Sequence, residues 1–467
     1  MSEQVSLPAT RALAHFAATA PLDSVPTAVR QRLKECLLDF IGNAAFAAAF
    51  AESSPAFRAG AAALAGGPCD ITVVGEANGM AFMSAALLNG AYAHTLDFDD
   101  TNAWGSLHPG APVIAAAMVE AERVKATGSD WLVALAVGYE VACRVGAALG
   151  NTAYDRGFHI TGVAGIFGAV AAAGRLRGLN ADTMASAFGV ALSKSAASMQ
   201  YLENGSWNKR LHPGFAAHDA MVAIAFAQAG VEGADAALEG RYGLLMGYTN
   251  APRPALLTER LGQWWPSGET AIKPYPSCRF THGAAEVAIQ LHERCSRELR
   301  EEVTAALRAG ARVQLRLSPK AVQIVGERLP NKVHPRNIVD AQFSVYFQVA
   351  VAWLDGRCNW QGYQRIGDPD VEALCAAIDV TADPDVAIAG AALSLGTSFN
   401  LDARVDDPLG EDSNPFTGAP LRRKFDDLAV PVYGGIRASE IANRVAALEQ
   451  EIDTATLIRS FRRSMPS

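Results

Sequence analysis

Apolar residues in the first half of the chain recur at three- and four-residue spacing, with little of the alternation that strands show. The clearest examples are Pro112–Ala126 and Asp130–Leu149, which predict amphipathic helices. Alanine and glycine stand at many positions where a core would otherwise hold leucine or valine, and small side chains let helix axes approach closely. Residues 1–265 are therefore expected to be buried helix packed on helix.

The pattern changes in the second half of the chain. Ala311–Leu317 alternates apolar and polar residues over the length of a strand. More β-branched residues occur at Ala377–Thr381 and near Val405, whereas Val339–Leu354 is apolar with a helical period. We expect residues 266–405 to form a smaller α+β unit.

The tail returns to helical spacing. Leu421–Ala429 reads as a charged helix, and Ser439–Ile458 as a longer helix with an apolar stripe. Because that stripe needs a partner, the tail should pack back onto the N-terminal helices. The predicted fold is mainly α: a large all-helical domain formed by both chain ends (1–265 with 406–467), plus a smaller inserted α+β domain (266–405).

Composition narrows the classes of protein. Half of the 467 residues are hydrophobic and 19% are charged, which excludes global disorder. The net charge of −8 argues against nucleic acid or an anionic membrane as the main partner, while a local basic pocket for an acidic small molecule stays compatible with it.

The sequence shows neither a membrane-spanning run nor a secretory signal. The longest mostly apolar run, Gly162–Gly174, has 13 residues, fewer than the ~18 of a membrane span, and the N-terminus lacks the pattern of a secretory signal. A cytoplasmic protein with no membrane partner is expected. The seven cysteines lie far apart without a CxxC pair, which is a poor framework for disulfides, zinc or an iron–sulfur cluster.

The densest candidate cluster reads AHTLDFDDTNAWGSLHPG and ends with His108. Asp97, Asp99 and Asp100 repel one another unless partners or a cation intervene. If the segment begins a helix, Asp97 and Thr101 lie on one face of it. The positive end of the helix dipole would then stabilise the acidic residues in this first turn. The same residues fit D-x-D-x-T, the nucleophile motif of magnesium-dependent haloacid-dehalogenase-type phosphatases. That motif needs a preceding strand, and the preceding MSAALLNGAYAHTL reads as a helix.

A second cluster, GFHITGVAGIFGAV, places His159 just ahead of a helix. The positive end of a helix lowers the proton affinity of a histidine, which suits proton transfer near neutral pH. Gly162, Gly165 and Gly168 are spaced by three, which favours close helix packing over the G-x-G-x-x-G loop of a dinucleotide site.

Two further clusters carry cations. ENGSWNKRLHPG holds Lys209, Arg210 and His212 within four residues, a composition that suits a carboxylate clamp.

In IKPYPSCRFTHG, Lys273 and Arg279 are further candidates for binding carboxylates. Cys278 with His282 invites a nucleophilic-thiol interpretation, which we do not favour because no oxyanion hole is recognisable beside them. Proton abstraction beside a carboxylate is the chemistry that all these groups suit best.

Taken together, the segments resemble the MmgE/PrpD family. The likeness rests on HTLDFDDT…LHPG at His94–Gly110, GFHITGVAGIFGA at Gly157–Ala169, NKRLHPGFAA at Asn208–Ala217, KPYPSCRFTHG at Lys273–Gly283, and Ser318–Val345. The family includes 2-methylcitrate dehydratase, cis-aconitate decarboxylase and iminodisuccinate epimerase. The resemblance implies a homodimer, an active site between the helical and the inserted domain, and no cofactor, metal or iron–sulfur cluster.

The resemblance also implies roles. His159 or His108 would move the proton next to a carboxylate, and Asp97 would orient or charge-balance a histidine. Lys209 and Arg279 would hold carboxylates, with His212 supporting Lys209. The implied catalytic residues are Asp97, His108, His159 and Lys209, and the implied substrate-binding residues are Thr101, Arg210, His212, Lys273, Cys278, Arg279 and His282.

The chain departs from the family's motifs at Ile160 and Arg210, where relatives carry proline, and at Cys278, where vertebrate-type aconitate decarboxylases carry histidine. The expected function is a cofactor-independent carbon–oxygen lyase (hydro-lyase) that dehydrates a 2-methylcitrate-like hydroxy di- or tricarboxylic acid, as in propionate metabolism. The alternatives are a cis-aconitate-type decarboxylase, an epimerase of an amino- or imino-dicarboxylate, the phosphatase of Asp97–Thr101, and a non-catalytic binding protein.

Overall fold

The structure, a computed structural model, describes residues 7–64, 70–395 and 399–464. Cys69 and the first six residues, on which the expectations about disulfides and a secretory leader partly rest, lie outside these ranges. The other six cysteines are buried free thiols.

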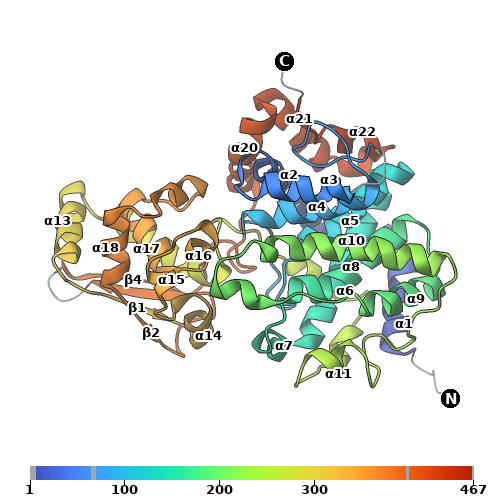
Figure 1. Cartoon of the computed structure of the whole chain (residues 1–467), viewed down its shortest axis with the longest axis horizontal. Coiled ribbons are helices and arrows are strands. Elements are labelled where there is room, and N and C mark those ends of the chain that lie inside the picture. The colour runs from blue at the N-terminus through green and yellow to red at the C-terminus, as the bar shows by residue number, and fades with distance from the viewer. Residues whose placement is uncertain (1–6, 65–69, 396–398, 465–467) are drawn as a thin grey trace.

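Helices from both ends of the chain share one large apolar core, and we call them the helical lobe (Figure 1). The lobe contains α1 (Ala9–Thr19), α2 (Thr27–Phe50), α3 (Ser54–Ala63), α4 (Phe82–Thr95), α5 (Gly110–Val124), α6 (Gly128–Leu149), α7 (Asn151–Asp155), α8 (Ile160–Leu176), α9 (Ala181–Leu192), α10 (Asn208–Gln228), α11 (Leu244–Tyr248), α20 (Gly418–Tyr433), α21 (Gly435–Ala446) and α22 (Thr454–Arg459).

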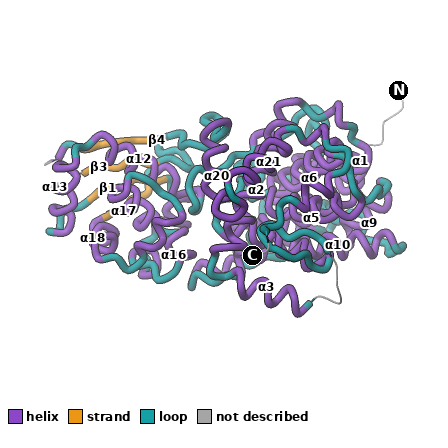
Figure 2. The backbone as a smooth tube through the Cα atoms, turned by 90° about the horizontal axis from the view of Figure 1, so that it is seen from above, coloured by secondary structure: helices purple, strands orange, loops and turns teal. Residues whose placement is uncertain are grey.

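A second apolar core lies under a four-stranded sheet, and we call its elements the sheet lobe (Figure 2). The strand order is β2-β1-β3-β4, with β1 parallel to β2 and antiparallel to β3, and β3 antiparallel to β4. Its elements are α12 (His282–Arg294), α13 (Arg297–Arg308), β1 (Val313–Leu317), α14 (Pro319–Ala321), α15 (Pro330–Val333), α16 (Ile338–Gln342), α17 (Val345–Asp355), α18 (Pro369–Ala377), β2 (Ile378–Ala382), β3 (Ala391–Leu395) and β4 (Leu401–Val405).

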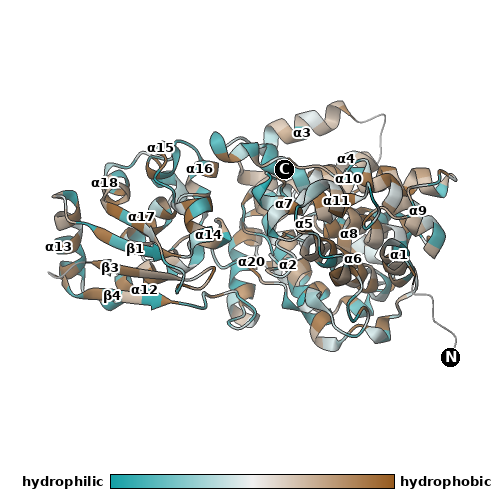
Figure 3. Ribbon diagram, turned by 90° about the horizontal axis from the view of Figure 1, so that it is seen from below, coloured by the Kyte–Doolittle hydropathy of each residue, from teal (hydrophilic) through white to brown (hydrophobic). Residues whose placement is uncertain are grey.

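Small residues bring the central helices together, as the sequence predicts. A Cβ on Gly168 of α8 would lie 2.5 Å from the carbonyl oxygen of Gly138 in α6. A Cβ on Gly214 of α10 would lie 2.3 Å from the carbonyl oxygen of Leu87 in α4. The most strongly hydrophobic colouring within the helical lobe lies around α6 and α8 (Figure 3). The glycines therefore set how closely the helices that carry the site residues approach.

The mainly α class is confirmed, and so is the return of the C-terminal helices to the N-terminal ones. Phe425 of α20 packs on Gly42 of α2, with 3.3 Å between its ring and a Cβ built at that glycine. Lys424 of the same helix ion-pairs with Asp39 of α2 at 2.5 Å. It also donates hydrogen bonds to the carbonyl oxygens of Phe98 (2.7 Å) and Lys273 (3.0 Å). A C-terminal helix thus anchors the two segments that form the site.

Two predicted helices are interrupted. Val339–Leu354 divides into α16 and α17 because the side chain of Ser344 caps the second helix, accepting from the amide of Phe347 at 3.0 Å. Ser439–Ile458 divides into α21 and α22, where Asp453 caps the latter.

One strand, β3, escapes prediction. Its AALSL lacks the β-branched residues that mark a strand in a sequence, yet it pairs with β1 and β4 and is almost wholly buried.

The expectation that no segment is apolar enough to span a membrane is wrong for α6, whose 22 residues pass by length and composition. Glu140 and Arg144 interrupt the run of apolar letters, but they pair with each other at 2.7 Å and both are fully buried. The most apolar part of α6 is enclosed on all sides by the protein. A bent pair, α2 with α3, also passes the same test.

Candidate active site

The acidic cluster is a turn that leaves a helix. α4 ends at Thr95, and Asp97 follows in the left-handed region with φ of +51°, which aspartate tolerates better than most residues. A helix therefore precedes Asp97 where the phosphatase motif needs a strand, and the structure contradicts that alternative. The interpretation of Asp97–Thr101 as a helix start is also wrong, because Thr101 pairs with Ala271 as an isolated bridge instead.

Asp97 holds two lysines that come from distant parts of the chain. Its Oδ1 lies 2.9 Å from Nζ of Lys209, at the start of α10, and 2.9 Å from Nζ of Lys273. The bridge between Thr101 and Ala271 brings Lys273 into place. Burial opposes ionisation of Asp97, but the two ammonium groups hold its pKa well below 3.8. Two cations and one anion leave this group with a net charge of +1.

Asp99 contacts two histidines through one carboxylate oxygen. Its Oδ2 lies 2.8 Å from Nδ1 of His94 and 3.3 Å from Nδ1 of His108. Burial opposes its ionisation too, yet the two rings hold the pKa of Asp99 well below 3.8. Burial lowers the pKa of His108 and brings that of His94 to about 4. Both rings are therefore neutral near pH 7, with Nδ1 directed at a carboxylate.

Among the residues that the structure describes, His94, Asp99 and His108 form the group close enough together to hold a metal ion. The ligand atoms of His94, Asp99 and His108 lie within 4.8 Å of one another. Both Nδ1 atoms already face one carboxylate oxygen, so they are arranged for hydrogen bonding. A metal would need these atoms to separate and face an ion at ~2.0–2.2 Å. The arrangement fits two oriented imidazoles better than a metal centre.

Asp100 faces away from the lysines and histidines. Its carboxylate accepts hydrogen bonds from the hydroxyl of Tyr139 (2.6 Å) and the amide of Gly110 (2.9 Å). Burial raises its pKa to about 7. The three adjacent carboxylates thus point to three different sets of partners, which resolves the repulsion that the sequence predicts.

His159 is the residue directly before α8, as predicted, and its ring is buried. Its Nδ1 lies 3.0 Å from Nδ1 of His212, so one ring donates to the other. Burial and the neighbouring rings lower both pKa values, that of His212 to about 3. The contact of His212 is therefore with His159 and not with Lys209, the residue it was expected to support.

Three other predicted binding residues have protein partners. Arg210 is buried and donates to Glu52 (2.7 Å) and Ser53 (2.9 Å). His282 is buried with Nε2 3.2 Å from the carbonyl oxygen of Ser277. Arg279 reaches the cavity described next, but its Nε donates to Glu411 at 2.7 Å. None of these three presents an uncommitted cation to a substrate.

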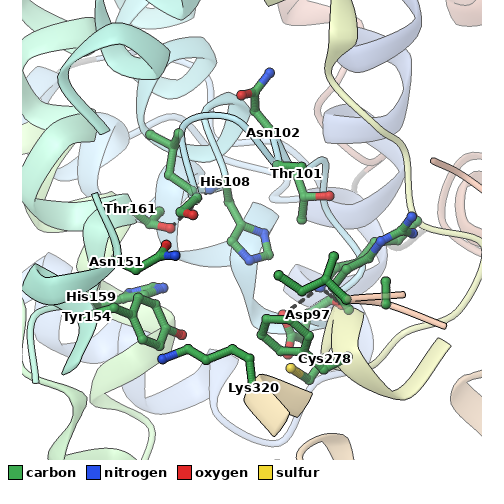
Figure 4. A pocket seen from close by; sticks show the side chains of 18 of the residues that line it. Asp97, Thr101, Asn102, His108, Asn151, Tyr154, His159, Thr161, Cys278 and Lys320 are labelled. Atoms are coloured by element: carbon green, nitrogen blue, oxygen red, sulfur yellow. Dashed lines mark hydrogen bonds and ion pairs between the residues drawn. The ribbon is translucent and has the colours of Figure 1, made fainter. Parts of the chain in front are cut away.

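A cavity of about 180 Å³ lies between the helical lobe and the sheet lobe, and Figure 4 shows its walls. Two histidines face it, with ring centroids of His108 and His159 6.4 Å apart. Arg210, His212 and His282 do not line it. The predicted site residues that do line it are Asp97, Thr101, His108, His159, Lys209, Lys273, Cys278 and Arg279.

The cavity is also lined by residues that the sequence did not single out, Asn151, Tyr154, Thr161, Phe343, Lys320 and Glu411 among them. Thr161 accepts a hydrogen bond from the amide of His108 at 3.1 Å, which ties that loop to α8. Burial raises the pKa of the Cys278 thiol to about 11, so it is neutral near pH 7. A neutral thiol does not support the nucleophile interpretation.

Comparison with known proteins bears directly on this arrangement. Residues 11–257 match the MmgE/PrpD N-terminal domain, and residues 275–450 match the MmgE/PrpD C-terminal domain. The chain belongs to the MmgE/PrpD family. The two matches account for most of both lobes and include the cavity residues named above except Lys273, which lies between the two matched ranges.

Relatives within the MmgE/PrpD family carry one activity in their names. A cis-aconitate decarboxylase from Aspergillus terreus is 28% identical over 96% of this chain and 95% of its own length. The cis-aconitate decarboxylase-like protein oryM from Aspergillus oryzae is 26% identical over 93% of each chain. The human cis-aconitate decarboxylase is 26% identical over 80% of this chain and 78% of its own.

Proposed function

We propose that the protein is a lyase that forms a carbanion beside a carboxylate of a di- or tricarboxylic acid, and that it does so by decarboxylation. The juxtaposition of Lys209 and Lys273 with His108 and His159 around one small cavity carries this proposal. Fixed cations stabilise negative charge that develops in a water-poor site, each well-placed donor contributing about 3–4 kcal/mol by analogy with oxyanion holes.

In the proposed reaction, the bond between a carbon and its carboxylate breaks and carbon dioxide leaves. The electron pair stays on the carbon, conjugated with a second carboxylate held by Lys209 and Lys273. A histidine then donates a proton to the carbanion and is reprotonated from water. His108, neutral in the empty site, takes up a proton from water when the anionic substrate binds. It is the better donor because Asp99, at 3.3 Å, stabilises its protonated ring, whereas His159 faces the uncharged His212.

Decarboxylation is proposed ahead of the dehydration that the sequence favoured because the named relatives are cis-aconitate decarboxylases. Dehydration and epimerisation would pass through a similar carbanion. Dehydration would then expel the neighbouring hydroxyl group, whereas epimerisation would add the proton to the opposite face. The hydro-lyase, 2-methylcitrate and propionate assignments have no support in the relatives' names.

We also propose that the chain is organised as one domain of residues 1–265 with 406–467 and another of 266–405. The two separate apolar cores support this division. Met199 and Tyr201 pack with the second core although they precede its other members in the chain, so the boundary near the site is shared.

The test is proton NMR in deuterated water with chelator-treated protein and, separately, cis-aconitate, 2-methylcitrate, citrate and iminodisuccinate. We expect loss of carbon dioxide from cis-aconitate, with deuterium in the product at the protonated carbon. H108A and K209A should lower turnover at least about 100-fold, and H159A should show whether the second ring contributes. H218A and K194A, which change a half-buried and an exposed residue outside the cavity, are matched controls.

Full turnover by H108A and K209A would refute the site assignment. Dehydration of 2-methylcitrate without decarboxylation of cis-aconitate would return the assignment to the hydro-lyase. Binding of these acids with no conversion of any would favour a non-catalytic protein.

A further inference from the structure

Four cations line the cavity, and each faces an acid among the residues that the structure describes. Lys209 and Lys273 share Asp97, as described above. Arg279 and its partner Glu411 also line the cavity. The fourth, Lys320, has no role in the proposed chemistry so far.

Lys320 differs from the others in its place and in its partner. It comes from α14 of the sheet lobe, and its Nζ lies 2.6 Å from Oδ1 of Asp155, the last residue of α7 in the helical lobe. Its ammonium group also lies 5.5 Å from the ring centre of Tyr154. In Figure 4 its ammonium end points toward Tyr154 and away from Asp97.

Asp155, the partner of Lys320, is exposed enough to be replaced by another carboxylate. The side chain of Asp155 is 49% exposed, against 2% for Asp97. An ion pair that reaches water contributes little net stability, because both groups are solvated when apart. Asp155 can therefore turn to solvent at small cost when another carboxylate takes its place, whereas Asp97 is enclosed with its lysines.

We propose that Lys320 binds a second carboxylate of the substrate, which replaces Asp155, while Lys209 and Lys273 hold the first. This inference rests on the proposed function and deepens it. One cationic position lies at Asp97 and the other beside Tyr154, and His108 lines the same cavity. An acid that spans the two positions therefore presents its middle carbons to the cavity that His108 lines. The site then selects acids with at least two separated carboxylates over monocarboxylates.

The competing explanation is that Lys320 and Asp155 only hold the two lobes together. Both explanations predict that K320M weakens binding, but they differ for D155N. If Asp155 competes with the substrate, its neutral replacement strengthens binding of a polycarboxylate. If the pair is a structural contact, D155N weakens binding as K320M does, and for ligands of any charge.

The experiment is isothermal titration of tricarballylate, a saturated tricarboxylate, and of butyrate into the wild type, K320M, D155N and the double variant. K194M and D219N change a lysine–aspartate pair that lies outside the cavity, 3.3 Å apart, and serve as controls. We expect K320M to raise the Kd of tricarballylate about tenfold and D155N to lower it severalfold, with Kd for butyrate changed less than twofold.

A shift in the same direction for K320M and D155N would overturn the proposal, and so would an equal effect on butyrate. A wild type that does not bind tricarballylate would overturn it as well. The titration measures binding of a saturated acid and requires no turnover. A protein that fails to decarboxylate cis-aconitate can therefore still show the expected changes in Kd, so failure of the proposed function and failure of this inference are distinguishable. Melting temperatures of the variants establish that each is folded.

Discussion

At the scale of single residues, the site depends on carboxylates whose partners are fixed by burial. Asp97 and Asp99 are two positions apart, yet one binds lysines and the other binds histidines. Both are ionised in a buried setting because their partners outweigh desolvation. We interpret Asp99 as a positioning residue that acts through His108.

Replacing Asp99 by asparagine tests that role. D99N keeps the size of the side chain but removes the charge that stabilises protonated His108, so kcat should fall about 100-fold or more. Because Asp99 favours protonation of His108, the limb on which kcat falls with rising pH should move to lower pH. Steady-state kinetics from pH 5 to 9 measure both effects.

D219N is the matched control, since Asp219 lies 2.9 Å from Nδ1 of His218 outside the cavity. Its kcat and pH profile should match the wild type. An unshifted pH profile in D99N with a lowered melting temperature would indicate a structural role only.

At the scale of elements, the approach of α6 and α8 decides where His159 stands. Gly168 is in contact with Gly138 across this helix pair, and a Cβ at Gly168 would also lie 2.7 Å from Cβ of Ala142. A side chain there must push α8 away from α6. Since α8 begins directly after His159, the displacement would reach the cavity.

G168A is therefore expected to destabilise the protein by about 1–3 kcal/mol, the usual cost of overpacking a core. Its activity should fall too. G247A is the control, because a Cβ at Gly247 in α11 meets nothing within 4 Å. Urea denaturation measures both variants, and equal stability of G168A and wild type would contradict the packing argument.

At the scale of the whole molecule, buried acids make stability depend on pH. Burial raises the pKa of Asp100 to about 7, that of Glu140 to about 7 and that of Asp39 to about 6. In each case the folded state holds the proton more tightly than the unfolded state does. The stability that each acid contributes is present below its ordinary pKa and is lost as the pH rises through the folded value.

D100N removes one of these titrations. Between pH 5.5 and 8, the wild type should lose about 2 kcal/mol of unfolding free energy more than D100N, at about 1.36 kcal/mol per pH unit up to pH 7. Urea denaturation at the two pH values measures the difference, in which all unchanged groups cancel. D182N changes an exposed aspartate and should follow the wild type. Parallel losses in D100N and wild type would contradict a buried, protonated Asp100.

Much of the site was accessible from the sequence because its residues occur in short, polar clusters within an apolar chain. Asp97, His108, His159, Lys209 and Lys273 were all predicted, and all line the cavity. The helices from Pro112 to Leu149 and the strand at Ala311–Leu317 followed from periodicity, which burial of one face imposes on any amphipathic element.

Partners were not accessible in the same way. Arg210 is one residue from Lys209 but faces Glu52, because successive residues of a helix point about 100° apart. Lys320 had no local signal, since its partner Asp155 is 165 residues away. The strand β3 lacks β-branched residues and exists because β1 and β4 flank it.

The sequence by itself determined the helical class, the family and the residue types of the site, because local periodicity and short motifs record them directly. The tertiary structure alone decided which acid faces which cation and that His212 contacts His159. These depend on contacts between residues far apart in the chain, and a buried charge takes whichever partner the packing of the helices brings within about 3 Å.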